Sequence, residues 1–205
     1  MDMKQRLIIA VFAVVGLAFV VGCSKDDTVL SSQRNDIVRF LTSSHVPRLV
    51  AEEDMESSLE AQPEFYQKLN VDLYRYISTY YDAGRDSRTM IDENDEVTMT
   101  FTAYTFTGGI PRTENIYLSN DAAVIEQLKQ AGLNSEYWSA EPLVVKLGET
   151  NIIKGVSKSL IGCREADKVE VYMTFEQAYQ NKVIGVVPFE SAVVWHYTID
   201  SVIKR

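Results

Sequence analysis

Residues 97–106 read VTMTFTAYTF and alternate between apolar and polar side chains. Val97, Met99, Phe101 and Ala103 fall on one face, and threonines fall on the other. Successive side chains of a β-strand point to opposite sides, so this pattern predicts a strand with one buried face. The stretch therefore indicates that a sheet forms the centre of the fold.

Four other stretches have the composition or the alternation of strands. They are residues 71–81, 142–147, 168–175 and 193–202. In the last of these, Val193, Trp195, Tyr197 and Ile199 share one face. Together with the first stretch, the sequence predicts five strands and no internal repeat.

A first helix is expected close to the start of the globular part. Ile37, Phe40 and Leu41 have the i, i+3, i+4 spacing of an amphipathic helix over residues 35–44. Pro47 limits this helix, because a residue that precedes proline is disfavoured in the helical conformation. An N-terminal helical segment over residues 35–65 is the resulting expectation.

Three further short helices are expected at residues 52–60, 120–130 and 152–161. Ser119 or Asn120 is expected to cap the second of them, and Gly132 is expected to end it. Helices and strands do not alternate regularly, which argues against a parallel sheet built from βαβ units. The predicted fold class is therefore α+β, with an antiparallel sheet and a short central helix.

The N-terminus, residues 1–22, resembles a bacterial lipoprotein signal. Its basic start is followed by an uncharged apolar stretch over residues 7–21, which is too short to cross a bilayer comfortably. Cys23 follows at once. The resemblance implies that Cys23 is lipidated and anchors the protein, with residues 23–34 as a polar tether.

Outer-membrane attachment in the cell envelope, facing the periplasm or the outside, is the location that this resemblance implies. The competing interpretation is a signal anchor in which Cys23 is an incidental buried residue. Cys163 has no intramolecular partner once Cys23 is lipidated, and a small buried hydrophobic role is the simplest expectation for it.

Composition narrows the function classes. The chain has 205 residues, 20 Lys and Arg against 29 Asp and Glu, and a net charge of −9. This balance argues against nucleic acid as a partner, because phosphate binding needs a concentrated basic surface. A hydrophobic content of 46% indicates a folded domain rather than a disordered chain.

Motifs for covalent, metal-assisted or nucleotide chemistry are absent from the sequence. His45 and His196 are isolated from each other, and the acidic runs at residues 52–54 and 92–95 lack the spacing of a calcium loop. No metal and no cofactor is therefore expected. Any activity should depend on binding in an apolar site.

Residues 151–156 in the C-terminal half read NIIKGV. They are similar to the motif E-V-I-x-G-W of the FKBP family of peptidyl-prolyl cis–trans isomerases. Residues 173–179, MTFEQAY, are similar to I-P-x-x-L-A-Y, and residues 187–195, VPFESAVVW, are similar to I-P-P-N-A-T-L-V-F. The resemblance implies an FKBP-like domain over residues 66–205, with a five-stranded antiparallel sheet wrapped around a short helix.

An inserted helix near residues 120–132 interrupts this resemblance. The implied activity is isomerisation of X–Pro bonds in proline-containing peptides or exported proteins. Uncatalysed isomerisation takes tens to hundreds of seconds. An apolar pocket that removes solvent from the amide and holds it twisted would lower this barrier without acid, base or metal.

The site residues that the resemblance implies fall into two groups. Tyr179, Ile153, Phe101 and Trp195 take the catalytic positions, with the backbone N–H of Ile153 holding the substrate carbonyl. The substrate-binding positions are Tyr117, Leu143, Ile152, Val156, Val186 and Val187.

Several positions depart from the family pattern. Val156 replaces the tryptophan of the pocket floor, Leu143 replaces a phenylalanine, and Leu118 replaces an aspartate. The implied pocket is shallower and less aromatic, so slow turnover is expected.

Two other functions remain open at this level. The protein could be a catalytically silent module that binds a peptide or partner, either in the same groove or at the tyrosines Tyr74, Tyr76, Tyr80 and Tyr81. The same tyrosines could instead capture glycans if they are exposed, although packing on a strand face is the simpler role.

Overall fold

The structure is a computed structural model of the chain. The described residues are 25–43, 46–61, 64–150 and 152–205. The predicted signal segment, the lipidation position Cys23 and the position Asn151 lie outside these ranges. Among the described residues, no helix is long and apolar enough to cross a membrane.

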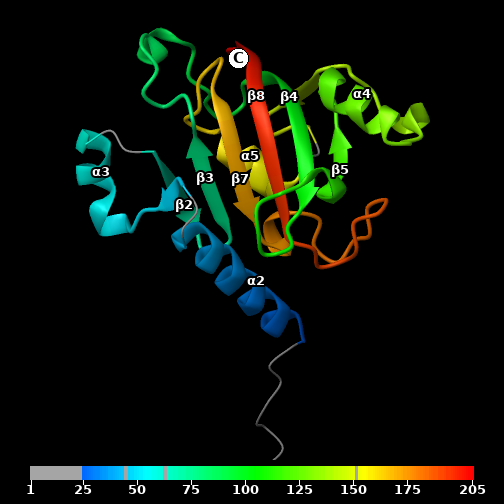
Figure 1. The fold of residues 1–205 in the computed structure, drawn as a ribbon. Helices are drawn as coiled ribbons and strands as arrows, with labels where there is room; N and C mark the ends of the chain where they lie inside the picture. Colours follow the sequence, from blue (N-terminus) through cyan, green and yellow to red (C-terminus); the bar gives the residue numbers. More distant parts are fainter. Residues whose placement is uncertain (1–24, 44–45, 62–63, 151) are drawn as a thin grey trace, which may run out of the picture.

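Eight strands form one sheet within the described ranges (Figure 1). They are β1 (Arg48–Leu49), β2 (Phe65–Asn70), β3 (Leu73–Ile77), β4 (Glu96–Thr105), β5 (Ile116–Ser119), β6 (Leu143–Lys146), β7 (Lys168–Met173) and β8 (Val193–Ile203). Their order is β1-β2-β3-β7-β8-β4-β5, and β6 pairs with β4 beside β5. Every pair except β1 with β2 is antiparallel, which confirms the predicted fold class.

Four α-helices and five short 3-10 helices lie within the described part of the chain. The α-helices are α2 (Lys25–Thr42), α3 (Met55–Ala61), α4 (Ala122–Gln130) and α5 (Lys154–Leu160). The 3-10 helices are η1 (Glu52–Asp54), η2 (Arg85–Ser87), η3 (Thr113–Asn115), η4 (Ser135–Tyr137) and η5 (Phe175–Gln177). Figure 1 shows α5 behind the sheet, with α2 on the opposite side.

The main core lies between the sheet and α5. The alternation that predicted β4 places Val97, Met99 and Ala103 on the inner face, where all three are fully buried. Val156 and Leu160 of α5 complete this core from the other side. A short helix and one face of a sheet therefore bury each other, as the sequence pattern predicts.

Close packing of α5 on β7 depends on Gly155. A Cβ atom at this position would lie 2.5 Å from the Sδ atom of Met173 and 3.1 Å from the carbonyl oxygen of Gln177. We expect Gly155→Ala to lower the free energy of unfolding by about 1–3 kcal/mol, because the helix must move off the sheet. Urea unfolding of the variant measures this change.

Gly109→Ala is the matched control for that measurement. A Cβ atom at Gly109 would meet no atom within 4 Å. The control should change the free energy of unfolding by no more than about 0.5 kcal/mol. Equal effects of the two substitutions would contradict the proposed close approach.

The N-terminal helix α2 packs on the outer face of the sheet and forms a second, smaller core. Ile37 and Leu41 are fully buried there against Tyr74 and Tyr172. The helical spacing predicted for residues 35–44 is present, but α2 begins at Lys25. The prediction of a tether over residues 23–34 is therefore wrong for the part that the structure describes.

Polar side chains hold residues 33 and 34 of α2 against the rest of the domain. Gln33 accepts the backbone N–H of Phe175 at 2.9 Å and donates to the carbonyl of Glu190 at 2.7 Å. Arg34 donates from Nε and Nη2 to both carboxylate oxygens of Asp72, at 2.8 and 2.9 Å. These hydrogen bonds hold a polar segment of the helix in place. Such a segment has no apolar periodicity from which the sequence could predict it.

Other boundaries also differ from the sequence prediction. The strands β1, β2 and β5 were not expected, and β3 ends at Ile77 because the chain turns there, with the N–H of Tyr80 bonded to the Ile77 carbonyl at 3.2 Å. Asp121 caps α4 by accepting the N–H of Ala123 at 2.8 Å. The helix α5 begins at Lys154, after an extended Ile153.

His196 lies on the outer face of β8, in contact with the ring of Tyr104 and 3.7 Å from a carboxylate oxygen of Glu170. Burial lowers the pKa of His196 below its usual value, and the charge of Glu170 only partly offsets this. A depressed pKa stabilises the fold above the unfolded-state value, and this contribution is lost as the pH falls through the folded-state value.

We therefore expect the free energy of unfolding to fall as the pH drops below about 6.5, the usual value for histidine. His196→Gln should flatten this slope. Urea unfolding at a series of pH values checks the prediction. If the free energy of unfolding of the variant depended on pH as that of the parent does, the loss of stability would come from other titratable groups.

Candidate functional site

Four aromatic side chains form one connected group at the edge of the main core, here called the aromatic cluster: Phe101, Tyr117, Tyr179 and Trp195. Phe101 on β4 and Trp195 on β8 are stacked, with ring centroids 4.4 Å apart and an interplanar angle of 11°. Both lie on the inner face because each follows the alternation of its strand. The register places Ala103 opposite Trp195, so Phe101 is the diagonal neighbour of the indole.

Hydrogen bonds link the other two rings to this stack. The indole Nε1 of Trp195 donates to the hydroxyl of Tyr117 on β5, at 2.9 Å. The hydroxyl oxygens of Tyr117 and Tyr179 lie 3.1 Å apart, and either can be the donor. Strands β4, β5 and β8 and the segment after η5 thus contribute one ring each.

Asn120 holds the backbone beneath the cluster. Its Oδ1 accepts the N–H of Phe101 at 2.6 Å, and its Nδ2 donates to the carbonyls of Met99 and Glu141 at 3.1 Å each. The sequence prediction assigned Asn120 only a capping role. A buried asparagine just after a strand can satisfy several backbone groups at once, but only the pairing of β4 with β5 reveals which ones.

The aromatic cluster carries no charge near neutral pH. Burial raises the pKa of Tyr117 well above its usual value, with the neighbouring Tyr179 adding to the effect. Burial also raises the pKa of Tyr179, although its hydrogen bond with Tyr117 opposes this. Both hydroxyls therefore stay protonated and act as neutral hydrogen-bonding groups.

Three of the other predicted site residues pack against the same core and remain partly exposed. They are Leu143, Ile152 and Ile153. Ile153 stands just before α5, with φ −58° and ψ 140°. Among the described residues, no group accepts its backbone N–H, so this donor is available.

The three predicted valines have different environments. Val156 and Val187 are fully buried in the main core. Val186 is 80% exposed, so the structure does not bring it into the group. Of these two neighbouring valines, Val187 is the one that packs inward.

Metal and thiol chemistry have little support in the described part of the chain. No group of three or more His, Cys, Asp or Glu side chains there could hold a metal ion. Cys163 is a free, fully buried thiol, and burial raises its pKa to about 11. A neutral thiol without solvent access agrees with the packing role expected for it.

A sequence profile of the FKBP-type peptidyl-prolyl cis-trans isomerase family matches residues 88–199. The match spans more than half of the chain and includes all four residues of the aromatic cluster. The chain therefore belongs to this family, and its fold is the FKBP fold.

Three of the solved structures to which this chain is similar come from plants. Wheat FKBP73, in a structure of its 3 FKBP domains, has 15% identity and a TM-score of 0.49, and the match covers 69% of this chain and 52% of that one. The N-terminal domain of FKBP42 from Arabidopsis thaliana has 10% identity and a TM-score of 0.46, with coverages of 68% and 92%.

A multi-domain immunophilin from Arabidopsis thaliana has 11% identity and a TM-score of 0.48, with coverages of 68% and 45%. The chain thus spans about half of the wheat structure. None of the curated proteins compared with the chain matches it significantly.

Proposed function

We propose that the protein is a peptidyl-prolyl cis–trans isomerase, or a folding helper with this activity, that acts on exported proteins in the cell envelope. The site consists of the aromatic cluster together with Ile152, Ile153 and Leu143. The substrate is an X–Pro segment whose proline ring lies against the partly exposed Tyr117 and Tyr179, over the buried rings of Phe101 and Trp195.

Desolvation supplies the catalysis in this proposal. Water stabilises the planar, polarised amide of the ground state, and an apolar site removes that water. The N–H of Ile153 would hold the substrate carbonyl while the C–N bond rotates. Because rotation breaks no covalent bond, no acid, base or metal is required.

One observation carries this proposal furthest. The N–H of Ile153, which has no acceptor among the described residues, stands beside the core that bears an uncharged cluster of four aromatic side chains. A single polar donor at the edge of an apolar surface is the arrangement that orients a small ligand. The two features come from separate segments of the chain, the cluster strands and the residue before α5, which only the fold brings together.

An isomerase assay tests the proposal directly. A proline-containing peptide should relax between its cis and trans forms faster in the presence of the full-length chain than in buffer with the same detergent. The acceleration should scale with protein concentration. A rate equal to that of buffer, with the protein folded by circular dichroism, would contradict the proposed activity.

A catalytically silent binding module is the second candidate. Two observations favour it: the hydroxyls of Tyr117 and Tyr179 are satisfied by each other, and Val156 is fully buried where the family has a tryptophan. Saturable binding of the same peptide without acceleration would support this candidate over the first.

Anchoring through Cys23 is the envelope part of the proposal, and the sequence resemblance alone supports it. Cells that express the chain should incorporate a labelled fatty acid into it. Cys23→Ser should abolish the incorporation, whereas Cys163→Ser should retain it. Equal labelling of both variants would contradict lipidation at Cys23.

A further inference from the structure

Two arginines of this protein bind carboxylates with the same edge of the guanidinium group. Arg34 uses Nε and Nη2 to hold Asp72, at 2.8 and 2.9 Å. Arg85 uses the same two nitrogens to hold Asp167, at 2.8 and 2.6 Å. This side-on pairing satisfies two donors with one planar anion.

A third arginine, Arg75 on β3, leaves that edge incomplete. Its side chain is on the inner face, and the residue is only 8% exposed. The nitrogen Nη1 donates to the carbonyls of Ser159 and Ile161 at the end of α5, at 2.9 and 2.7 Å, and lies 3.5 Å from Sγ of Cys163. These bonds cap the end of α5, and they use only the Nη1 nitrogen of the guanidinium group.

The other edge of Arg75 has one neutral partner. Nη2 donates to Oε1 of Gln67 at 3.0 Å, and Nε is buried with no hydrogen-bond partner among the described residues. No carboxylate of the described residues forms an ion pair with this guanidinium, in contrast to Arg34 and Arg85. A buried cation without a counterion is costly, so a carboxylate at this edge would be stabilising.

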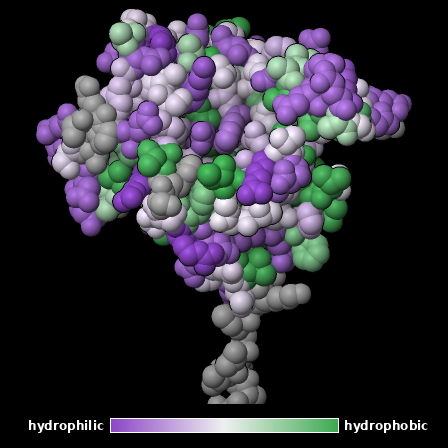
Figure 2. Space-filling view, in the orientation of Figure 1, coloured by the Kyte–Doolittle hydropathy of each residue, from purple (hydrophilic) through white to green (hydrophobic). Residues whose placement is uncertain are grey.

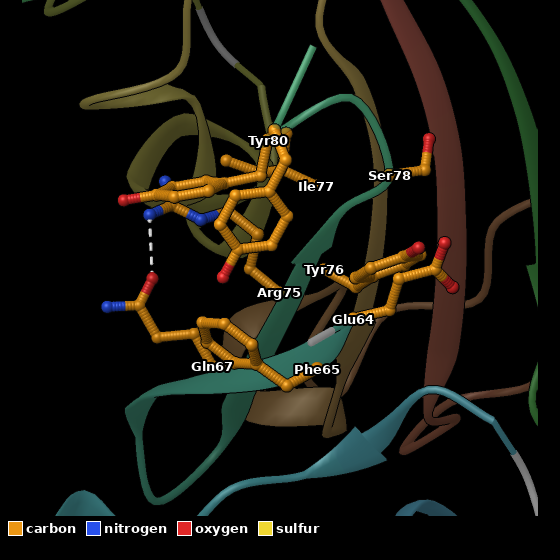
Figure 3. A pocket seen from close by; sticks show the side chains of 9 residues that line it. Glu64, Phe65, Gln67, Arg75, Tyr76, Ile77, Ser78 and Tyr80 are labelled. Atoms are coloured by element: carbon orange, nitrogen blue, oxygen red, sulfur yellow. Dashed lines mark hydrogen bonds between the residues drawn. The ribbon is translucent and has the colours of Figure 1, made fainter. Parts of the chain in front are cut away.

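This edge faces a small hollow at the margin of the sheet, shown in Figure 3. The hollow has a volume of about 30 Å³, and Gln67, Arg75, Phe65, Tyr80 and Tyr81 are among the residues that line it. Tyr81 is another lining residue, and its hydroxyl is also buried with no partner among the described residues. Two residues that line one hollow therefore each carry a donor without a described partner.

The charged residues that line the hollow are Arg75 and Glu64. Burial raises the pKa of Tyr76, and the nearby carboxylate of Glu64 adds to this effect. In Figure 3, Glu64 lies beside Tyr76 and apart from the bond between Arg75 and Gln67. A second guanidinium, that of Arg85, lies 4.7 Å from the ring of Tyr80, but it is already paired with Asp167, so Arg75 is the cation that a carboxylate would meet.

We propose that this hollow is a binding site for a carboxylate group. The carboxylate takes Nε and Nη2 of Arg75, displaces the amide oxygen of Gln67, and accepts the hydroxyl of Tyr81. The hollow has room for the carboxylate alone, so the body of the ligand lies across Phe65 and Tyr80, which is 37% exposed. The ligand is either a free organic acid or the carboxylate of a peptide.

The site is separate from the aromatic cluster and shares no residue with it. Of the four tyrosines considered in the sequence analysis, three line the hollow, namely Tyr76, Tyr80 and Tyr81. The fourth, Tyr74, is buried under α2. Failure of the isomerase proposal would therefore leave the carboxylate site unaffected, and the reverse also holds.

Calorimetric titration of the full-length chain in non-ionic detergent tests the site. The probes are 3-phenylpropionate with its amide, and an acetylated Gly-Gly-Phe peptide with a free or an amidated C-terminus. We expect at least one free carboxylate to bind about tenfold or more tightly than its amide, because a charge-assisted bidentate bond is lost in the amide. Binding of the peptide alone identifies a peptide carboxylate, and binding of the small acid alone identifies a free acid.

Variants distinguish this site from a nonspecific surface effect. Arg75→Lys should weaken carboxylate binding about tenfold, and Tyr81→Phe should weaken it severalfold, because each removes a donor. Gln67→Ala should bind the carboxylate as tightly as the parent or more tightly, because a competitor for Nη2 is removed. Arg112→Lys, on an exposed arginine, is the control and should change nothing.

Tyr81→Phe and Gln67→Ala keep the test decisive if Arg75→Lys does not fold. Three results would each overturn the proposal. The first is equal affinity for the acid and its amide, and the second is no saturation by either acid. The third is unchanged binding in Tyr81→Phe together with weaker binding in Gln67→Ala. The hollow would then hold water only.

Discussion

Asp167→Ala is expected to lower the free energy of unfolding by about 3–5 kcal/mol, the largest loss of stability that we predict for a single substitution. Asp167 is fully buried and receives both Nε and Nη2 of Arg85, which is itself only 7% exposed. It also accepts the hydroxyl of Thr79 and the N–H of Arg164. The variant leaves a buried guanidinium without its anion.

Urea unfolding measures this loss, and two further variants interpret it. Glu114→Ala removes a partner from the exposed pair with Arg112, and it should change stability by no more than about 0.5 kcal/mol. The double variant Arg85→Met with Asp167→Ala should recover part of the loss, since no charge then remains buried. A loss below about 1 kcal/mol in Asp167→Ala would contradict this account of the pair.

Ile153→Pro is expected to reduce isomerase activity about tenfold or more, because it removes the N–H proposed to hold the substrate carbonyl. The backbone suits this substitution, since φ of Ile153 is −58° and proline favours about −65°. Proline is also tolerated where a helix begins. The change should therefore remove a donor with little change in the fold.

Ile153→Val is the matched control, because it shortens the side chain and keeps the N–H. Both variants are compared with the parent in the peptide isomerisation assay, after circular dichroism has checked their folding. An equal reduction in both variants would assign the effect to side-chain packing. Full activity in Ile153→Pro would exclude the proposed role of the amide.

The sequence predicts the strands that bury one regular face. It does not predict the elements whose position depends on contacts with distant segments. Period-two alternation places β4, β7 and β8 correctly, because burial of one face is a property of the local residue order. The strand β2 was missed since its burial depends on α2, and β1 and β5 are too short to give a pattern. The start of α2 was missed because hydrogen bonds of Gln33 and Arg34 to distant segments hold it.

The same distinction applies to the candidate site. Phe101, Trp195, Tyr117 and Tyr179 were selected from the sequence by resemblance, and the structure links all four through stacking and hydrogen bonds. The supporting role of Asn120 and the open edge of Arg75 were not predictable from the sequence. Each depends on which backbone or side-chain groups from remote segments meet a polar side chain, and no local periodicity encodes this.

Exchange NMR on one sample tests the proposed isomerase most directly. A proline-containing peptide is added to the full-length chain, and the cis–trans exchange rate is recorded together with the indole N–H resonance of Trp195. We predict faster exchange than in buffer and a shift of the Trp195 resonance that saturates with peptide, while Trp138 serves as the internal reference. Absence of acceleration, despite a saturating shift at Trp195, would contradict isomerase activity and leave a binding module.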